Sequence, residues 1–287
     1  MKLTSRIFYI GMIYLFSVSH SAKAENLSFK LFDGQDKLVC EASSPISKGK
    51  AEINLNFERD FQEGDYLLIA GANYLYINLK DSIKSAYVYV PNKSFRYILP
   101  LKERGQTKPL SAFSGKSHQI EILSLSEKEW KVSRNIALNP FDIRGISKCY
   151  PHATSNSEYG NQSVFAAKNA IDGFKANQNH GKWPYQSWGP YKGDSLWLKI
   201  DFGKVVEVDK IVIVNRAQFA DNHDSAWKNA TLEFSDGTTE KISLKKTHLT
   251  QEIKIKKRKT STIKFYELQV FEANWCSWIE VEVWGKY

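Results

Sequence analysis

Cysteines and the motifs of common enzymes are scarce in this chain. Its 287 residues include three cysteines, Cys40, Cys149 and Cys276, with no Cys-x-x-Cys pair and no Cys/His cluster of zinc-ligand spacing. These absences weigh against thiol-redox and zinc chemistry. The sequence also lacks Gly-x-Ser-x-Gly, His-Glu-x-x-His and a phosphate-binding glycine loop. We therefore expect a protein that is not an enzyme, because no catalytic site is visible.

Long apolar runs are absent as well. The apolar run from Ile7 to Val18 has twelve residues, fewer than the roughly 20 that a transmembrane helix needs. Lys2 and Arg6 precede it and Ala22-Lys23-Ala24 follows it, which predicts a signal peptide over residues 1–24 rather than a membrane anchor. We expect a protein without a transmembrane segment, secreted or periplasmic, and compatible with association with the cell surface.

The net charge excludes few classes of binding partner. The formal charge of +9 falls to +6 (9 minus 3) when Lys2, Arg6 and Lys23 leave with the signal peptide. This excess slightly favours anionic partners, but no zinc-finger, helix-turn-helix or ribonucleoprotein motif supports nucleic-acid binding. The odd number of cysteines in the mature chain leaves at least one outside any intramolecular pair.

Alternating apolar and polar residues dominate, and long helical periodicity is nearly absent. Ile53, Leu55 and Phe57 alternate with polar residues, as in a half-buried strand. Further strands are expected at 27–32, 66–70, 75–79, 86–90, 95–99 and 118–123. Their close spacing and the turn residues between them predict an accessory antiparallel β-sandwich over residues 25–145.

The alternating strand pattern is interrupted between residues 126 and 145. Ser126 and Glu129 have the spacing of a capping box, which predicts one short helix. The stretch 135–145 contains Asn139-Pro140 and predicts a linker that ends near residue 145. The β pattern then resumes, with Asp236-Gly237 as a hairpin turn and strands expected at 197–202, 210–215, 230–234, 238–244, 251–255, 261–268 and 279–284. These seven or eight strands suit a jelly roll, so the fold class is all-β with two β-sandwich domains.

Four blocks of the second half carry a family resemblance. They are Asn-Ala-Ile-Asp-Gly at 169–173, Trp-Leu-Lys-Ile-Asp-Phe-Gly at 197–203, Val-Glu-Val-Asp-Lys-Ile at 206–211 and Ile-Glu-Val-Glu-Val-Trp-Gly at 279–285. In order and separation they resemble the discoidin family, also called coagulation factor five/eight type C, which has a galactose-binding-like fold. The resemblance covers roughly residues 147–287 and implies a discoidin-like domain over 146–287. The first half resembles a leading module that accompanies such domains in some secreted bacterial proteins.

The resemblance also implies a structural calcium ion. Its ligands would be side-chain oxygens of Asp172, Asn177 and Glu280 and carbonyl oxygens of Asn169, Phe174 and Ile279, a donor set that suits a hard cation. Asn177 and Phe174 depart from the residues that the family often has at these positions. The alternative is a simple tight turn at Asp172-Gly173, with Glu280 as a solvated strand residue.

The family often joins the two ends of the domain with a disulfide. The resemblance therefore implies a bridge between Cys149 and Cys276, whereas a bridge between Cys40 and Cys149 is the competing pairing.

Three loops of the second half combine aromatic side chains with planar polar groups. Aromatic rings stack on the apolar face of a sugar, and amides, carboxylates and guanidinium groups bond to its hydroxyls. In the family that the chain resembles, such loops at one end of the sandwich bind ligands. The candidate ligand-binding residues are His180, Trp183, Tyr185, Gln186, Arg216, Asp221, Asn222, His223, Trp227 and Trp275.

These loops predict a lectin-like protein that binds a glycan or polysaccharide. The main alternative is an adhesion module for anionic polysaccharide or phospholipid surfaces, because nine Lys or Arg lie between Lys241 and Lys264. A simpler explanation of that run is an edge strand, with Lys254 and Lys256 on its solvent face. A glycan-processing enzyme would have to use carboxylates such as Asp221, Asp224 or Glu280.

Overall fold

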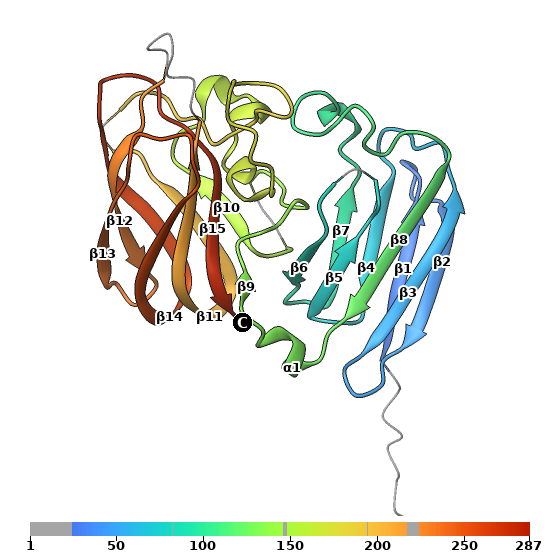
Figure 1. The fold of residues 1–287 in the computed structure, drawn as a ribbon. Coiled ribbons are helices and arrows are strands. Elements are labelled where there is room, and N and C mark those ends of the chain that lie inside the picture. Colours follow the sequence, from blue (N-terminus) through green and yellow to red (C-terminus); the bar gives the residue numbers. More distant parts are fainter. Residues whose placement is uncertain (1–24, 82, 146–147, 194, 217–223) are drawn as a thin grey trace, which may run out of the picture.

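The computed structural model describes residues 25–81, 83–145, 148–193, 195–216 and 224–287. The expected signal peptide, residues 1–24, lies outside them. The described part is nearly all β and forms two sandwiches side by side (Figure 1), which confirms the predicted fold class. None of the helices in these ranges is both long and apolar enough to span a membrane.

The N-terminal sandwich consists of two four-stranded antiparallel sheets. One has the order β2 (Leu38–Pro45), β1 (Asn26–Phe32), β4 (Tyr66–Ala70) and β7 (Ser94–Ile98). The other has the order β3 (Ala51–Glu58), β8 (Ser117–Ser124), β5 (Tyr74–Asn78) and β6 (Ala86–Tyr89). A short 3-10 helix, η1 (Leu101–Glu103), follows β7.

Alternating burial explains why most of these strands were predicted. In β1, Leu27, Phe29 and Leu31 are buried while the residues between them are not. The pleat places every second side chain on the same face of a strand, so this alternation faces the core. Strand β2 was missed because its side chains are mostly exposed and its sequence, Leu-Val-Cys-Glu-Ala-Ser-Ser-Pro, gives little alternation.

The C-terminal domain is built around two long strands. Its seven-stranded sheet has the order β13 (Thr239–Ser243), β12 (Trp227–Phe234), β14 (Gln251–Val270), β11 (Leu198–Asn215), β15 (Trp278–Lys286) and β9 (Arg134–Asn135), and β10 (His152–Ser155) also pairs with β11. Short 3-10 helices, η2 (Tyr159–Asn161), η3 (Ser163–Phe165) and η4 (Ala167–Ile171), lie between β10 and β11.

The strand predictions missed the short strands β9 and β10, and they divided two long strands. The segments 197–202 and 210–215 belong to one strand of 18 residues, β11, and 251–255 and 261–268 belong to one of 20 residues, β14. The register of β11 against β14 shifts between Asp201 and Val206. Such irregularities bend a strand, so each long strand serves both layers of the jelly roll.

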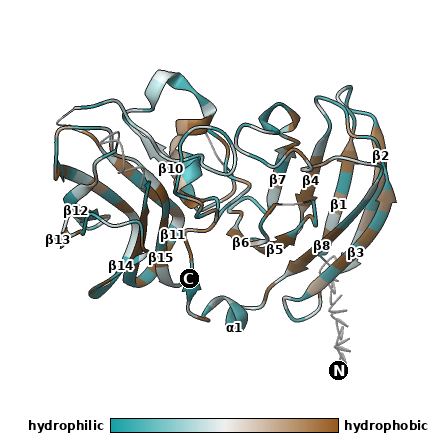
Figure 2. Cartoon of the chain, turned by 45° about the horizontal axis from the view of Figure 1, so that its top comes forward, coloured by the Kyte–Doolittle hydropathy of each residue, from teal (hydrophilic) through white to brown (hydrophobic). Residues whose placement is uncertain are grey.

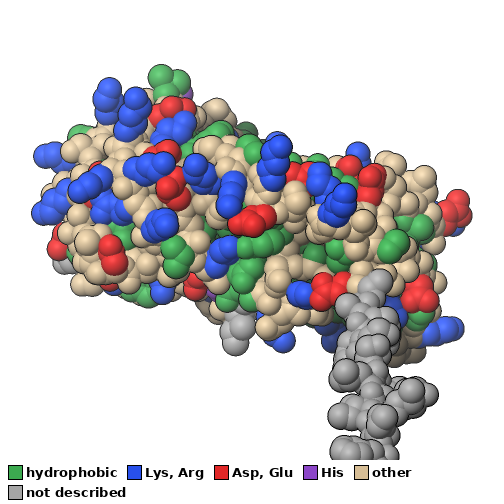
Figure 3. Space-filling model, turned by 90° about the horizontal axis from the view of Figure 1, so that it is seen from below, with side chains coloured by type: hydrophobic (Ala, Val, Ile, Leu, Met, Phe, Trp, Pro, Cys, Tyr) green, Lys and Arg blue, Asp and Glu red, His purple; other side chains and the backbone are tan. Residues whose placement is uncertain are grey.

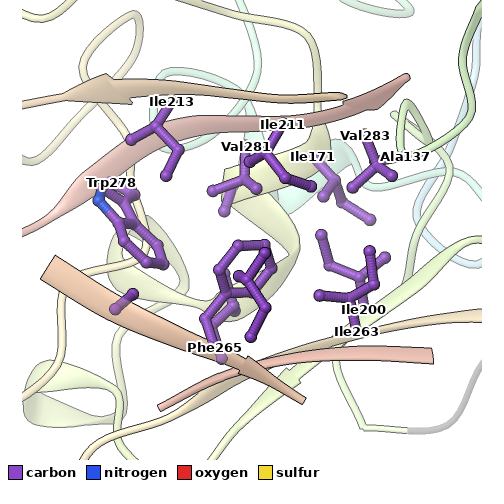
Figure 4. Packing of buried hydrophobic residues seen from close by; sticks show 14 of the residues in the cluster. Ala137, Ile171, Ile200, Ile211, Ile213, Ile263, Phe265, Trp278, Val281 and Val283 are labelled. Atoms are coloured by element: carbon purple, nitrogen blue, oxygen red, sulfur yellow. The ribbon is translucent and has the colours of Figure 1, made fainter. Parts of the chain in front are cut away.

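The C-terminal core is dense with aromatic and branched side chains. Ile200, Phe265, Trp278 and Val283 point toward one another between the strands (Figure 4). The rings of Trp188 and Trp227 stack at 5.2 Å between centroids. Hydrophobic residues alternate with polar ones along the strands of both sandwiches (Figure 2). The predicted helix is also present as α1 (Glu127–Trp130), and the backbone N–H of Ser126 donates to Glu129 as the capping box requires.

Residues 136–142 are mostly buried rather than exposed as a linker, whereas residues 143–145 are exposed. Ile136 belongs to the C-terminal core, whereas Phe141 and Cys149 belong to the N-terminal core. Cys276 lies in the C-terminal core, and the structure has no disulfide between it and Cys149. The pairing implied by the family resemblance is therefore wrong for this structure, because the chain crosses to the other core before residue 149.

The two sandwiches contact each other directly. Tyr89 of β6 and Tyr150 exchange two backbone hydrogen bonds of 2.9 Å. Lys168 of η4 pairs with Glu103 of η1 at 2.6 Å. The backbone N–H of Trp183 donates to the carbonyl of Gln106 at 2.7 Å. Both backbone pairing and a partly buried ion pair therefore fix the C-terminal domain against the N-terminal one.

The lysine-rich part of β14 agrees with the simpler explanation. Ile255 is buried, whereas Lys254, Lys256, Lys257 and Lys259 are exposed. Over residues 251–260 the described strand pairings of β14 are with β11 alone, so this half lies at an edge. Seen from below, Lys and Arg side chains gather over the C-terminal domain, at the left of Figure 3.

Candidate functional site

The loop end of the C-terminal domain holds a pocket of about 160 Å³. It forms where the connection between β10 and β11, the end of β11 and the loop before β15 meet. Its lining residues are Tyr159, Phe165, His180, Gly189, Pro190, Arg216, Trp275 and Ser277. His180, Arg216 and Trp275 were predicted to bind ligand, and the structure brings these three together from three separate segments.

Arg216 is held rigidly in the wall of this pocket. Its Nε lies 3.0 and 2.9 Å from the two carboxylate oxygens of Asp224, and its Nη2 also bonds to Asp224. Both side chains are buried, and the backbone N–H of Arg216 donates to the carbonyl of Ser277. A bidentate hydrogen bond of this kind fixes the plane of a guanidinium group. Arg216 therefore offers a positioned hydrogen-bond donor whose charge is balanced by Asp224.

Aromatic rings form the other wall. Trp275 is partly exposed and meets Tyr159 edge to face, with ring centroids 5.0 Å apart and planes at 81°. Tyr191 lies beside Tyr159 at 5.0 Å, and its hydroxyl accepts a bond from the backbone of Gly160. Tyr159 and Tyr191 remain 37% and 50% exposed. Exposed rings of this kind can stack on the apolar face of a sugar.

The sequence did not single out Tyr159, Tyr191 or Lys192. Tyr159 lies in a polar stretch, Ser-Glu-Tyr-Gly, that predicts only a turn, and it reaches Trp275 through contacts between segments more than a hundred residues apart. Tyr191 and Lys192 follow Gly189-Pro190 directly. The one local signal was that Tyr191 is an aromatic residue directly after Gly189-Pro190.

Four predicted ligand-binding residues do not line this pocket. Trp227 is buried in the core, stacked on Trp188, because it belongs to β12 rather than to a loop. Gln186 is buried and donates to Asp172 at 2.9 Å. Trp183 lies against the N-terminal sandwich through Gln106, and its ring meets Phe174 at 4.3 Å. Tyr185 is partly buried and bonds through its backbone to Lys182. Asp221, Asn222 and His223 lie outside the described residues.

Two buried carboxylates mark the position where calcium was expected. Asp172 accepts bonds from the backbone of Phe174 and the amide of Gln186, and Glu280 accepts one from the backbone of Gly173 at 3.0 Å. Burial raises the pKa of Asp172 to about 6, although the charge of Lys108 opposes this shift. Burial and the charge of Asp172 raise the pKa of Glu280 above its usual range.

The oxygen atoms here partly fit a hard cation. Glu280 Oε1 and Gln186 Oε1 are buried and have no hydrogen-bond partner in the structure. Orphaned oxygens of this kind are costly unless a cation or water satisfies them. Among the described residues, however, no group of three or more His, Cys, Asp or Glu is placed to hold a metal ion. A cation here would therefore depend on amide and carbonyl oxygens as well.

The other expected calcium ligands surround this pair. Asn169 is buried and donates to the carbonyls of Ser163 and Ser187. Asn177 is buried and donates to the carbonyl of His248 at 2.6 Å. Ile279 precedes Glu280 in β15 and is buried. The side-chain nitrogens of both asparagines thus bond to the backbone.

Of the carboxylates considered for glycoside hydrolysis, the two described ones, Asp224 and Glu280, are not arranged for it. Asp224 is paired with Arg216, and Glu280 is buried beneath the turn at Gly173. A hydrolase needs two carboxyl groups that flank an accessible substrate bond. Asp221, the third candidate, lies outside the described residues.

The C-terminal domain is the part of the chain that is similar to known proteins. The family model of the F5/8 type C domain matches residues 152–281. No curated protein matches the chain. Among solved structures, a chitosan-binding module from a Paenibacillus sp. IK-5 chitosanase/glucanase is 19% identical, covering 53% of this chain and 99% of its own, with a TM-score of 0.38.

Two further solved structures are similar to the same extent. A fucose-binding module of Streptococcus pneumoniae is 18% identical over 54% of this chain and 99% of its own, with a TM-score of 0.40. A family 32 carbohydrate-binding module of Clostridium perfringens, in complex with galactose, is 19% identical over 46% of this chain and 91% of its own, with a TM-score of 0.36. The match of the family model identifies residues 152–281 as an F5/8 type C, or discoidin, domain.

Proposed function

We propose that the C-terminal domain binds glycans, without altering them, in the pocket between Tyr159, Arg216 and Trp275. The observation that carries the proposal is the pairing of exposed aromatic rings with a guanidinium group that Asp224 holds in place. A pyranose has one apolar face and a rim of hydroxyls. Aromatic rings stack on the first, and a preoriented donor bonds to the second at little entropic cost.

The balance of charge in this pocket suits neutral hydroxyl groups. Asp224 neutralises Arg216, so the guanidinium group offers directed N–H donors with little net attraction for an anion. The volume of about 160 Å³ suits one sugar ring rather than a folded chain. This pocket therefore takes one ring of a glycan.

We further propose that calcium supports this domain at Asp172 and Glu280. The orphaned oxygens Glu280 Oε1 and Gln186 Oε1 support a cation there. A half-turn of the Gln186 amide would direct its oxygen toward Asp172, where its nitrogen now lies. The bound ion would supply charge neutralisation for two carboxylates and fix the loop from Asp172 to Asn177. We also retain the signal peptide at residues 1–24 and a secreted or periplasmic location as part of the proposal.

A glycan array of the purified mature protein tests the function, followed by titration calorimetry with the best ligand. Trp275→Ala should weaken binding at least tenfold, because it removes the stacking surface. Phe271→Ala is the matched control, since Phe271 is also an exposed ring near β15 but lines neither pocket at this end. Its affinity should stay within twofold of the wild type. No binding to any glycan, with binding to phosphatidylserine vesicles instead, would refute the proposal in favour of adhesion to anionic surfaces.

A further inference from the structure

A second pocket of about 170 Å³ adjoins the first. The two share Pro190 and Trp275 as lining residues, so the side chain of Trp275 borders both. The remaining lining residues of the second pocket are Tyr191, Lys192, Gly193, Leu196, Trp227, Val270, Ala273, Asn274 and Cys276. A ligand that fills both pockets therefore needs at least two consecutive rings, one on each side of Trp275.

The two pockets differ in charge. In the first, Arg216 is neutralised by Asp224. In the second, Lys192 Nζ lies 4.9 Å from the centre of the Trp275 ring and 3.4 Å from Asn274 Oδ1, and none of the described lining residues is acidic. The two printed contacts of this ammonium group are thus an aromatic face and an amide oxygen, and neither of them is an anion.

We infer that the glycan bound by this domain is acidic. The inference rests on the proposed function and deepens it: one neutral ring occupies the pocket at Arg216, and the adjoining ring carries a carboxylate or sulfate that meets Lys192. Lys192, Asn274 and Trp275 all line the second pocket, so the ammonium group is within reach of such a substituent. A neutral hydroxyl there would gain only an ordinary hydrogen bond, whereas an anion gains a charge-assisted one.

The size of the preference follows from the exposure of Lys192. An ion pair between an exposed lysine and an anion contributes up to about 1 kcal/mol in water, which corresponds to about fivefold in affinity. We therefore expect the acidic form of a disaccharide to bind about fivefold more tightly than its neutral form. The preference should decline in high salt, because salt screens exposed charges.

Calorimetry with the wild type and three variants tests this. The probes are the neutral disaccharide that binds best on the array, its uronic acid form and its sulfate ester. Lys192→Gln should abolish the preference, so that the two acidic probes bind no more tightly than the neutral one. Lys256→Gln, the same charge change on exposed β14, should leave the preference intact. The third variant is Asp194→Asn. Asp194 lies outside the described residues but is two positions from Lys192 in the sequence, so loss of its negative charge should keep or raise the preference for the acidic probes.

The outcomes separate the two proposals. Equal binding of neutral and acidic probes by the wild type overturns the inference and leaves glycan binding intact. An acidic preference that survives Lys192→Gln also overturns it. Loss of the preference in Lys256→Gln as well would assign it to the overall charge of the domain rather than to this pocket. A wild type that binds no glycan at all refutes the proposed function itself.

Discussion

The two sandwiches use their strands differently. In the N-terminal domain the strands are 4 to 8 residues long. In the C-terminal domain, β11 and β14 run for 18 and 20 residues and bend through both layers. Long connections then join the remaining strands at one end, including residues 156–197 between β10 and β11. The pocket next to Arg216 and its neighbour lie among these connections, not in the N-terminal domain.

This difference separates support from recognition. Loops that lie on a rigid scaffold can vary their side chains without loss of the core, so binding residues concentrate there. The N-terminal domain instead contributes groups that hold the other domain, such as Glu103 to Lys168 and Gln106 to the backbone of Trp183. We therefore regard it as a support that contacts the base of the loops.

The sharpest test of this comparison removes one large ring from each core. Phe29→Ala and Phe265→Ala should each lower the free energy of unfolding by about 3–5 kcal/mol, because both rings are fully buried. Phe265 lies 5.4 Å from Trp278, whose backbone bonds to Trp188 next to the pocket residue Gly189. Phe265→Ala should therefore also weaken glycan binding, whereas Phe29→Ala should leave the affinity of the folded protein within twofold.

Denaturant unfolding gives the stabilities and calorimetry below the unfolding transition gives the affinities. If Phe29→Ala weakened binding as much as Phe265→Ala, the N-terminal sandwich would be part of the recognition site. The division between support and recognition would then be wrong.

Calcium provides a second test, confined to the C-terminal domain. Calcium at a hundredfold excess over its dissociation constant should stabilise the protein by about 2.7 kcal/mol, and a chelator should remove this gain. Asp172→Asn should abolish it, whereas Asp209→Asn, the same change at an exposed position of β11, should not. Melting curves with and without chelator measure the effect. Identical wild-type curves would remove the ion from the proposal.

Much of the fold, but less of the site, follows from the sequence alone. Alternation as in β1 is local, since the pleat imposes it on each strand separately. By contrast, Trp183, Gln186 and Trp275 look alike as loop residues, yet one contacts Gln106, one bonds to Asp172 and one lines the pocket. Their environments depend on segments distant in sequence, which no local pattern encodes. Only the family resemblance predicted that Asp172 and Glu280 lie close together, because members of a family share their tertiary contacts. The backbone of Gly173 indeed bonds to Glu280.

The smallest expected effect concerns the segment between the two domains. His152 of β10 lies 2.7 Å from Asp142 of that segment, and its other ring nitrogen meets the carbonyl of Gly145. Burial lowers the pKa of His152, but the hydrogen bond and charge of Asp142 outweigh it, so the pKa is raised above 6.5. A raised histidine pKa means that the folded state binds the proton more tightly than the unfolded state does. The stabilisation is therefore complete below pH 6.5 and is lost as the pH rises through the folded pKa.

Because one proton is involved, the slope cannot exceed about 1.4 kcal/mol per pH unit. Urea unfolding of the wild type between pH 6 and 9 should show this decline, and His152→Gln should flatten it. His248→Gln is the control, because His248 uses only its backbone carbonyl, toward Asn177, among the hydrogen bonds of the described residues. A decline that persists in His152→Gln would mean that the segment is not anchored to β10 through this pair. The segment would then behave as a linker, and the two sandwiches would be joined mainly by the contacts of Tyr89 and Lys168.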